Sequence, residues 1–449
     1  MEYDTASLVQ ADLAHVIHGN TNLHDYLHGD GPIILVKGEG AIVADSNGKE
    51  YIDGLGGLWN VNVGHGRKEI AQAVADQINE IAYVPTMLAL SNVPAIRLAE
   101  KLAQITPEPI DHFFFACGGA EGNETAFKMV RYLNSVQGRK DKTKIISRQM
   151  AYHGLAQASM TATGLPQFWR HFGPPAPGIV HIPAPYCYRC AFGKTYGQCN
   201  LDCALALEGA IQAEGEESVA AFIGEPVQGA GGVIVPPKEY WPLIRDICTR
   251  YNVLLIADEV ITGFGRTGTY FGVQQWGIKP DLMTMAKGIT SAYLPLSAVG
   301  VSPAVFEAMA VPGAAFMHNY TYSGHPVACA ASLKNLEILE RENLVQNAAE
   351  VGRYLNDRLA ELRDLPHVGE TRGVGLIAAI EFVADKKTKA RFEPQQRFGA
   401  QMMKLTRAKG LLSRAGDEYL ALAPPLVIDR AQVDTIVEVI RSALLSVKV

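Results

Sequence analysis

The sequence lacks any long hydrophobic run and any excess of positive charge. No apolar stretch reaches the roughly 20 residues that a membrane-spanning helix needs, and the formal net charge of the 449 residues is −6. The first residues, MEYDTASLVQADLAHV, have neither a basic start nor an apolar signal core. These absences argue against a membrane protein and against a nucleic-acid-binding protein. We therefore expect a cytoplasmic protein.

Internal repeats and low-complexity segments are also absent, which argues against repeat arrays and disordered chains. Hydrophobic residues make up 48% of the chain and charged residues only 19%, a balance that is typical of a globular protein with a sizeable core. At this length the chain holds two domains, or one large α/β domain with a smaller companion. Cysteine is scarce as well, with seven residues. In a cytoplasmic protein we expect these cysteines to be reduced or metal-bound.

Short apolar runs alternate with helical patterns between about residues 110 and 300. A strand, then a helix, then a strand in this order predicts an α/β fold whose central sheet is mainly parallel and covered on both faces. The runs are HFFFA (112–116), KIIS (144–147), VAAFIGEP (219–226), VLLIAD (253–258) and DLMTMAK (281–287).

The two ends of the chain predict a second, smaller α+β domain. The segment 41–57 resembles a hairpin, and helical patterns at 328–344 and 431–445 flank a strand candidate at 374–383. We expect the N-terminal segment to join the smaller domain, which makes that domain discontinuous. The expected division is 1–55 for the N-terminal segment, 56–325 for the large domain and 326–449 for the small C-terminal domain.

Two charged residues stand at the ends of predicted strands, where ligands of open parallel sheets collect. Asp258 ends one run and Lys287 ends another. Strand geometry puts Asp258 and Val260 on one face while Glu259 points away. An acid suits a ring nitrogen, and a buried lysine suits Schiff-base chemistry, so the pair matches the needs of pyridoxal phosphate. Taken alone, an acid such as Asp258 at a strand end is more often part of an ion pair or a helix cap.

A phosphate group also needs a binding site, and the segment 114–133 supplies a strand, a glycine-rich turn and the start of a helix. The backbone N–H groups of Gly118, Gly119 and Ala120, with the positive end of that helix, would hold a phosphate. A purely structural turn is the alternative.

Aromatic side chains follow in AYHG (151–154). They offer Tyr152 and His153 to stack on the ring face opposite Val260, although single aromatic residues usually belong to a core.

The order of these segments resembles that of the class III, pyridoxal-phosphate-dependent aminotransferases of fold type I. The glycine-rich turn, AYHG, GEPVQG, ADEVITGFGRTG, MAKGI and YTYSGHPVACAASL carry the resemblance, which runs from about residue 30 to the end. It implies that Lys287 forms the Schiff base with the cofactor and moves the proton during catalysis. It also implies that Asp258 keeps the pyridine nitrogen protonated, and that Glu259 is structural.

The same resemblance implies a homodimer with shared active sites, in which Thr321 reaches the phosphate of the neighbouring subunit. A tetramer stays open. The other implied cofactor contacts are Val260 with Tyr152 or His153 on the two ring faces, Gln228 at the phenolic oxygen, and Glu225 close by.

One departure from the family concerns the phosphate site. The family usually has Ser-Gly-Ser where this chain has Gly118, Gly119 and Ala120. The hydroxyl contacts to the phosphate are then missing, so we expect weaker binding of the same cofactor.

Two further residues resemble the ω-amino acid and amine:pyruvate transaminase subgroup. Arg414 stands where that subgroup carries a mobile arginine, which binds the carboxylate of a keto acid in a bidentate fork. The acetylornithine-like subgroup has its arginine at the position of Ala421. Trp59 fits an aromatic residue that lines the substrate pocket. The alternatives are a surface ion pair of Arg414 with Asp417 or Glu418, and a core role for Trp59.

Four of the seven cysteines fall within 17 residues of one another, in YCYRCAFGKTYGQCNLDCA (186–204). Cys187, Cys190, Cys199 and Cys203 could complete a four-thiolate centre for zinc or a [4Fe–4S] cluster. The alternative is reduced thiols or occasional disulfides in a surface loop.

Taken together, these features predict an ω-transaminase that works by a ping-pong reaction. The donor would be taurine, β-alanine, another ω-amino acid or a simple amine, and the acceptor pyruvate or a related keto acid. Three alternatives stay open. They are an aminomutase or racemase with the same cofactor, a GABA- or acetylornithine-type transaminase, and a metal-bearing electron-transfer or sensing protein with a vestigial pocket.

Overall fold

The computed structural model describes residues 3–29 and 31–447. Its largest element is a seven-stranded sheet made of β4 (His112–Ala116), β5 (Lys144–Arg148), β6 (Ile179–Ile182), β7 (Val219–Gly224), β8 (Leu254–Asp258), β9 (Leu282–Met285) and β10 (Ser297–Val301). The strand order is β4-β10-β9-β8-β7-β5-β6. Strands β5 to β9 pair in parallel, whereas β10 runs antiparallel to both of its neighbours. The sheet is therefore mainly parallel, as predicted.

All five apolar runs singled out in the sequence are strands of this sheet, and the α/β fold class is confirmed. The sequence did not predict β6 or β10. Strand β10 reads SAVGV and β6 reads IVHI, and neither is long or apolar enough to stand out beside its flanking segments.

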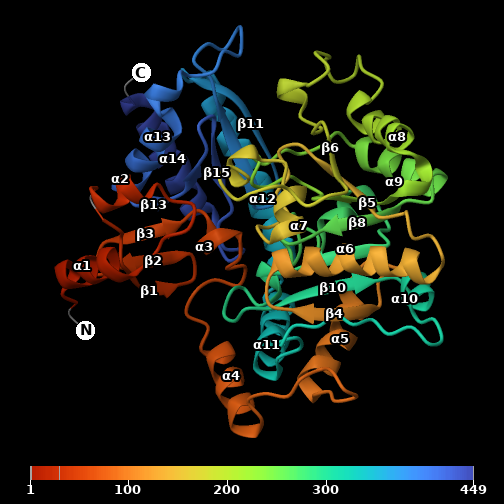
Figure 1. Ribbon diagram of the computed structural model, residues 1–449. Helices are drawn as coiled ribbons and strands as arrows, with labels where there is room; N and C mark the ends of the chain where they lie inside the picture. The colour runs from red at the N-terminus through yellow and green to blue at the C-terminus, as the bar shows by residue number, and fades with distance from the viewer. Residues whose placement is uncertain (1–2, 30, 448–449) are drawn as a thin grey trace.

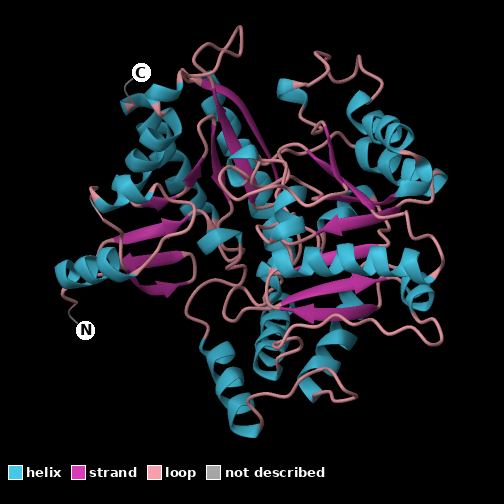
Figure 2. Ribbon diagram, in the orientation of Figure 1, coloured by secondary structure: helices cyan, strands magenta, loops and turns pink. Residues whose placement is uncertain are grey.

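Helices cover both faces of the sheet, because alternate residues of each strand point to opposite sides. In β8, Leu255 and Ala257 belong to one hydrophobic cluster and Ile256 to another. The first face packs against α5 (Val93–Ile105), α8 (Asp202–Glu214) and α9 (Tyr240–Arg250), and the second against α6 (Gly119–Val136), α7 (Gln157–Ala162) and α10 (Pro303–Met309). Figure 2 shows this layering of helices and strands.

A smaller lobe contains strands from both ends of the chain, which lie side by side in Figure 1. One sheet holds β1 (Leu35–Glu39), β2 (Ile42–Asp45), β3 (Glu50–Asp53) and β13 (Leu411–Leu412), and another holds β11 (Val368–Val374), β12 (Ile377–Phe382), β15 (Tyr419–Leu422) and β14 (Arg414–Ala415). Strand β13 pairs in parallel with β3, so the first sheet joins the two ends. The expected hairpin is β2–β3. The expected strand at 374–383 is β12 with the end of β11, because the chain turns back at 375–376.

The remaining helices are α1 (Thr5–His15), α2 (Leu23–Leu27), the short α3 (Gly56–Trp59), α4 (Lys68–Glu80), α11 (Pro326–Arg341), α12 (Leu344–Ala360), α13 (Phe398–Ala408) and α14 (Arg430–Ser446). Helix α11 joins the two lobes, since Cys329 packs in the core of the large sheet and Leu339 in the core of the smaller lobe. We propose domain boundaries near residues 55 and 325. None of the described helices combines the length and the apolarity that a membrane crossing requires.

Helix α12 lies so close to the β11–β12 turn that a side chain has no room between them. A Cβ on Gly352 would lie 2.2 Å from the carbonyl carbon of Gly375. Gly352→Ala should therefore lower the free energy of unfolding by about 1–3 kcal/mol through overpacking. Gly209 in α8 is the matched control, because a Cβ there meets nothing within 4 Å. Gly209→Ala should raise stability by up to about 1 kcal/mol. Thermal unfolding measures both, and equal effects would contradict this packing.

Candidate active site

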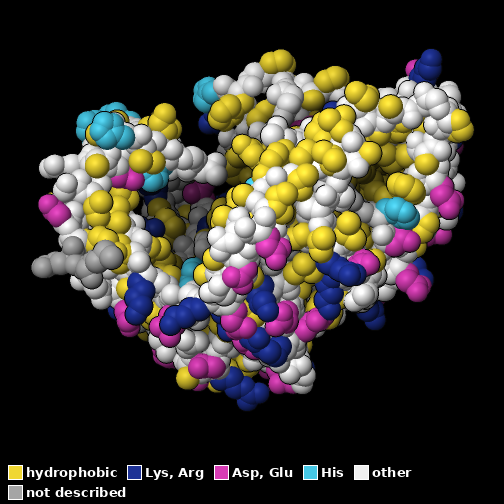
Figure 3. Space-filling view, turned by 90° about the horizontal axis from the view of Figure 1, so that it is seen from below, with side chains coloured by type: hydrophobic (Ala, Val, Ile, Leu, Met, Phe, Trp, Pro, Cys, Tyr) yellow, Lys and Arg dark blue, Asp and Glu magenta, His cyan; other side chains and the backbone are white. Residues whose placement is uncertain are grey.

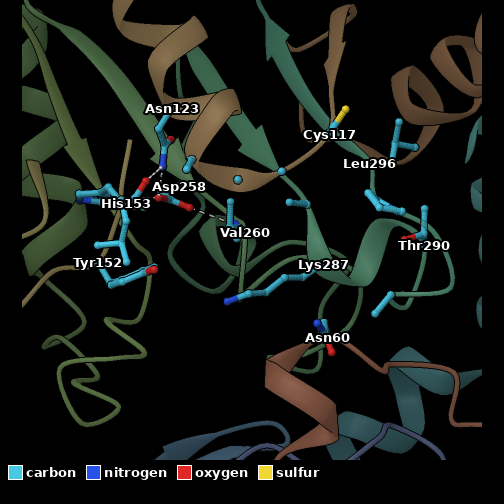
Figure 4. A pocket seen from close by; sticks show the side chains of 18 of the residues that line it. Asn60, Cys117, Asn123, Tyr152, His153, Asp258, Val260, Lys287, Thr290 and Leu296 are labelled. Atoms are coloured by element: carbon cyan, nitrogen blue, oxygen red, sulfur yellow. Dashed lines mark hydrogen bonds and ion pairs between the residues drawn. The ribbon is translucent and has the colours of Figure 1, made fainter. Parts of the chain in front are cut away.

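The carboxyl ends of β5, β7, β8 and β9 meet at one edge of the large sheet, and a cavity of about 510 Å³ opens there. Cofactor pockets typically have volumes of ~300–1,000 Å³. Figure 4 shows the side chains that line the cavity. The predicted residues among them are Gly118, Gly119, Ala120, Tyr152, His153, Asp258, Val260 and Lys287.

Lys287 lies two residues after the end of β9 and reaches into the cavity (Figure 4). Burial lowers the pKa of its amine from 10.5 to about 8, because the charged form loses its water. The negative charges of Asp258 and Glu225 oppose this shift, and the positive charges of Arg414 and Arg266 reinforce it. A substantial share of the amine is therefore uncharged slightly above neutral pH, and an uncharged amine can act as a nucleophile or a base.

Asp258 ends β8 and is held by a network of hydrogen bonds. Its Oδ2 lies 2.7 Å from Nδ1 of His153 and accepts a hydrogen bond of 2.8 Å from Nδ2 of Asn123. Its Oδ1 accepts the backbone N–H of Val260 at 3.1 Å. The imidazole of His153 is fully buried, and its bond to Asp258 makes it a partner that orients the acid. Tyr152 and Val260 border the part of the cavity into which Lys287 reaches (Figure 4).

Glu225 and Gln228 lie behind the cavity wall. The Glu225 carboxylate accepts the backbone N–H groups of Tyr152 and Gly229, each at 2.9 Å, and burial raises the pKa of this acid. Gln228 is fully buried and donates its side-chain N–H to the carbonyl oxygen of Gln149 at 3.0 Å. These contacts tie together the two turns that follow β5 and β7.

Glu259 points away from the cavity, so of the two adjacent acids only Asp258 can meet a ligand there. Its carboxylate accepts the backbone N–H groups of Gly272 and Val273 at 2.8 and 2.7 Å and the hydroxyl of Thr262. Burial raises its pKa to about 7. Glu259 thus holds a neighbouring turn in place.

Helix α6 begins at the cavity and offers its N-terminal N–H groups to an anion. Gly118 is the residue before the helix, and a Cβ there would meet nothing within 4 Å. A Cβ on Gly119 would lie 2.9 Å from both methyl groups of Val260. The residues present fit pyridoxal phosphate: an anion site at the start of α6, an acid at Asp258 and a buried amine at Lys287.

Trp59, Thr321 and Arg414 do not belong to the described wall of the cavity. Trp59 is only 1% exposed and packs in a hydrophobic cluster with Val227 and Ile261, and its place in the substrate pocket stays a prediction. Thr321 lies on an exposed loop, where its carbonyl oxygen accepts the hydroxyl of Tyr83 at 2.6 Å.

Arg414 lies on β14, near enough to the site for its charge to act on two groups. Burial raises the pKa of Tyr152 and the charge of Arg414 opposes this rise, whereas for Lys287 the same charge reinforces the lowering of the pKa by burial. The expected competitors do not hold Arg414, because Glu418 pairs with Arg391 at 2.7 Å and lies 3.8 Å from Arg189. Within residues 3–29 and 31–447 no hydrogen bond or ion pair engages the Arg414 guanidinium.

The predicted metal site at the four-cysteine loop is not supported. Cys187, Cys190, Cys199 and Cys203 all border one small cavity, yet all four are free thiols. No group of three or more His, Cys, Asp or Glu residues in the described chain is arranged to hold a metal ion. Burial raises the pKa of Cys203 to about 11 and also that of Cys187.

Sequence reasoning missed several residues of the cavity, among them Asn60, Asn123 and Thr290. Asn123 is the most important, since it holds Asp258 from a position 135 residues away in the chain. Its only signal is a polar residue on the first turns of α6, and such residues usually face solvent.

The family model described as "Aminotransferase class-III" matches residues 26–444. The chain belongs to the class III aminotransferases, which are pyridoxal-phosphate-dependent transaminases.

Several proteins are similar to this chain over nearly their whole length. The diaminobutyrate–2-oxoglutarate transaminase of Halomonas elongata is 45% identical, over 96% of this chain and 94% of that protein. The putrescine–pyruvate aminotransferase of Pseudomonas aeruginosa is 42% identical, over 93% and 91%. The solved structure of a thermostable (S)-enantioselective ω-transaminase from Thermomicrobium roseum is 49% identical, with a TM-score of 0.97 over 100% of this chain and 99% of that one.

The open space beside Gly118 allows a direct test of the phosphate site. Gly118→Ser should add a hydroxyl donor and tighten pyridoxal phosphate binding by about 5-fold, the value of one additional hydrogen bond. Gly119→Ser is the control, because its Cβ would collide with Val260, and it should weaken binding. Cofactor titration of the cofactor-free protein measures both constants. A Gly118→Ser variant that binds no better would contradict a phosphate at this turn.

Proposed function

We propose that the protein is an ω-transaminase that moves the amino group of a simple amine or diamine to pyruvate or a related keto acid. The observation that carries this proposal is the unpaired Arg414 beside the site. A guanidinium without a protein partner is available to a keto-acid carboxylate, which it can hold in a bidentate fork.

Pyridoxal phosphate, when bound, supplies an aldehyde carbon for the incoming amine and a ring that withdraws electrons from the reacting carbon. Around it, Lys287 is assigned the covalent link to the cofactor and the transfer of the proton. Asp258 is assigned to hold a proton on the ring nitrogen, and His153 and Asn123 fix the direction of its carboxylate. Tyr152 and Val260 are assigned to the two faces of the ring.

The charges around the cavity favour a donor without an acid group. Lys287 is the one basic side chain other than His153 among the described residues that line it, and its amine is needed for the chemistry. Arg414 then serves the acceptor carboxylate. Taurine and β-alanine would need a second cation to bind their acid group. We therefore expect them to be poorer donors than amines and diamines that carry no acid group. The printed name of one relative, a putrescine–pyruvate aminotransferase, supports a diamine donor.

We also propose a homodimer, in which Thr321 approaches the phosphate site of the partner. Large hydrophobic side chains are exposed near this loop and elsewhere, including Met317 at 89% and Leu88 at 81%. Figure 3 shows a broad area of hydrophobic side chains on one face of the molecule. A groove of about 380 Å³ also runs beside the edge strand β4, where Phe114 and Phe306 line it. Such extended apolar surface is typical of an interface between subunits.

The two half-reactions, measured separately, test this function. With the wild-type protein, an aryl-alkyl amine or a diamine should change the absorbance of the bound cofactor faster than β-alanine or taurine does. Arg414→Leu should lower kcat/KM for pyruvate by about 10- to 100-fold, since a charge-assisted bidentate bond is lost. It should leave the amine half-reaction nearly unchanged. Arg391→Leu removes an exposed arginine that pairs with Glu418 and should change neither half-reaction.

Three results would contradict the proposal. A protein that accepts taurine but no simple amine or diamine as the donor would show that a second anion site exists. An unchanged kcat/KM for pyruvate in Arg414→Leu would remove the assigned role of this arginine. Product formation without any keto acid would identify an aminomutase or a racemase.

A further inference from the structure

Arg266 belongs to the GFGRTG segment after β8 and is fully buried, yet the site described above gives it no role. Its guanidinium donates to the carbonyl oxygens of Leu376 and Pro424 and to Oδ1 of Asn62 at 3.0 Å. All three acceptors are uncharged, and burial lowers the pKa of Arg266 to about 9. A buried cation whose hydrogen-bond acceptors are all neutral is costly, and the negative charge of Asp53 offsets part of this cost.

Two of these contacts reach the smaller lobe. Leu376 forms the turn between β11 and β12, and its backbone N–H donates to the carbonyl oxygen of Arg266 at 3.0 Å. Pro424 follows β15, the strand that pairs with β14 and thus with Arg414. Arg266 therefore ties the segment after Asp258 to the strands that carry the proposed acceptor arginine.

The third contact leads to Lys287. Asn62 accepts from Arg266, donates its Nδ2 to the carbonyl oxygen of Phe264 at 2.8 Å, and is 1% exposed. Its amide lies directly against Gly288, where a Cβ would be only 2.4 Å from Nδ2. Gly288 follows Lys287, whose φ of 49° is in the left-handed region. A lysine stays in that conformation only when its surroundings hold it there.

We propose that Arg266 is a positioning residue for Lys287. Through Asn62 it holds the backbone at Gly288. Through Leu376 and Pro424 it fixes the position of β14 and β15, and thus of Arg414, relative to the lysine. Arg266 also contributes directly, because its charge helps to keep the Lys287 amine unprotonated. The inference rests on the role of Lys287 under the proposed function.

Asn62→Ala tests the link to Lys287 without removing the buried cation. Asn134→Ala is the matched control on α6. Asn134 is 2% exposed, donates to the carbonyl oxygen of Val130 at 3.0 Å, and accepts from an arginine, Arg139, at 2.9 Å. Both substitutions therefore remove a buried amide with the same kinds of partners, and their losses of thermal stability should be similar. They differ in that Asn134 has no contact with the candidate active site.

The readouts are the pKa of Lys287 in the cofactor-free protein, from competitive acetylation against pH, and the single-turnover rate of the holoenzyme with an amine. Asn62→Ala should raise the pKa by about half a unit or more, because a looser backbone admits water. It should slow the single turnover by about 10-fold. Asn134→Ala should leave both values unchanged.

Arg266→Lys separates charge from geometry. It keeps the positive charge but cannot fork to three acceptors, so the pKa of Lys287 should rise and the single turnover should slow, as in Asn62→Ala. Equal pKa values and equal turnover rates in Asn62→Ala and Asn134→Ala would overturn the positioning role. Lys287→Ala tests the proposed function separately from the role of Arg266. If that variant still completes the amine half-reaction, the role of Lys287 itself fails, whatever Arg266 does.

Discussion

The proposed chemistry depends on one amine, that of Lys287, which is buried close to the end of a β-strand. Desolvation alone would drive the pKa of Lys287 far down, and two nearby acids, Asp258 and Glu225, limit the shift to a value of about 8. This balance leaves an amine that can be uncharged for attack and charged after it accepts a proton. The acids in turn depend on their own partners, since His153 and Asn123 hold Asp258 and two backbone N–H groups hold Glu225.

The parallel sheet brings these groups together. Strands β5, β7, β8 and β9 run in the same direction, so the residues that follow each strand meet at one edge. The smaller lobe adds Arg414 from a strand near the C-terminus, and the buried guanidinium of Arg266 lies where the two lobes touch. The fold therefore sets the distance between Lys287, the proposed proton-transfer group, and Arg414, the proposed carboxylate-binding group, through a few polar contacts.

The sequence predicts most of the sheet because the parallel strands β7, β8 and β9 are buried on both faces and read as continuous apolar runs. The shared face of Asp258 and Val260 follows from the period of two in a strand. Contacts between residues far apart in the sequence cannot be predicted in this way. Asn123 meets Asp258 across 135 residues, and His153, one of two residues expected at a ring face, hydrogen-bonds to Asp258. The cysteine spacing predicted a metal centre, but spacing does not determine whether thiols ionise or converge on one point.

Reductive trapping tests the central claim most directly. The protein with bound pyridoxal phosphate is treated with borohydride, digested, and its peptides are weighed by mass spectrometry. The account predicts that the mass of the reduced cofactor is found on the peptide that contains Lys287 and on no other lysine peptide. Attachment to a different lysine, or a cofactor that is released intact, would show that Lys287 is not the reacting amine.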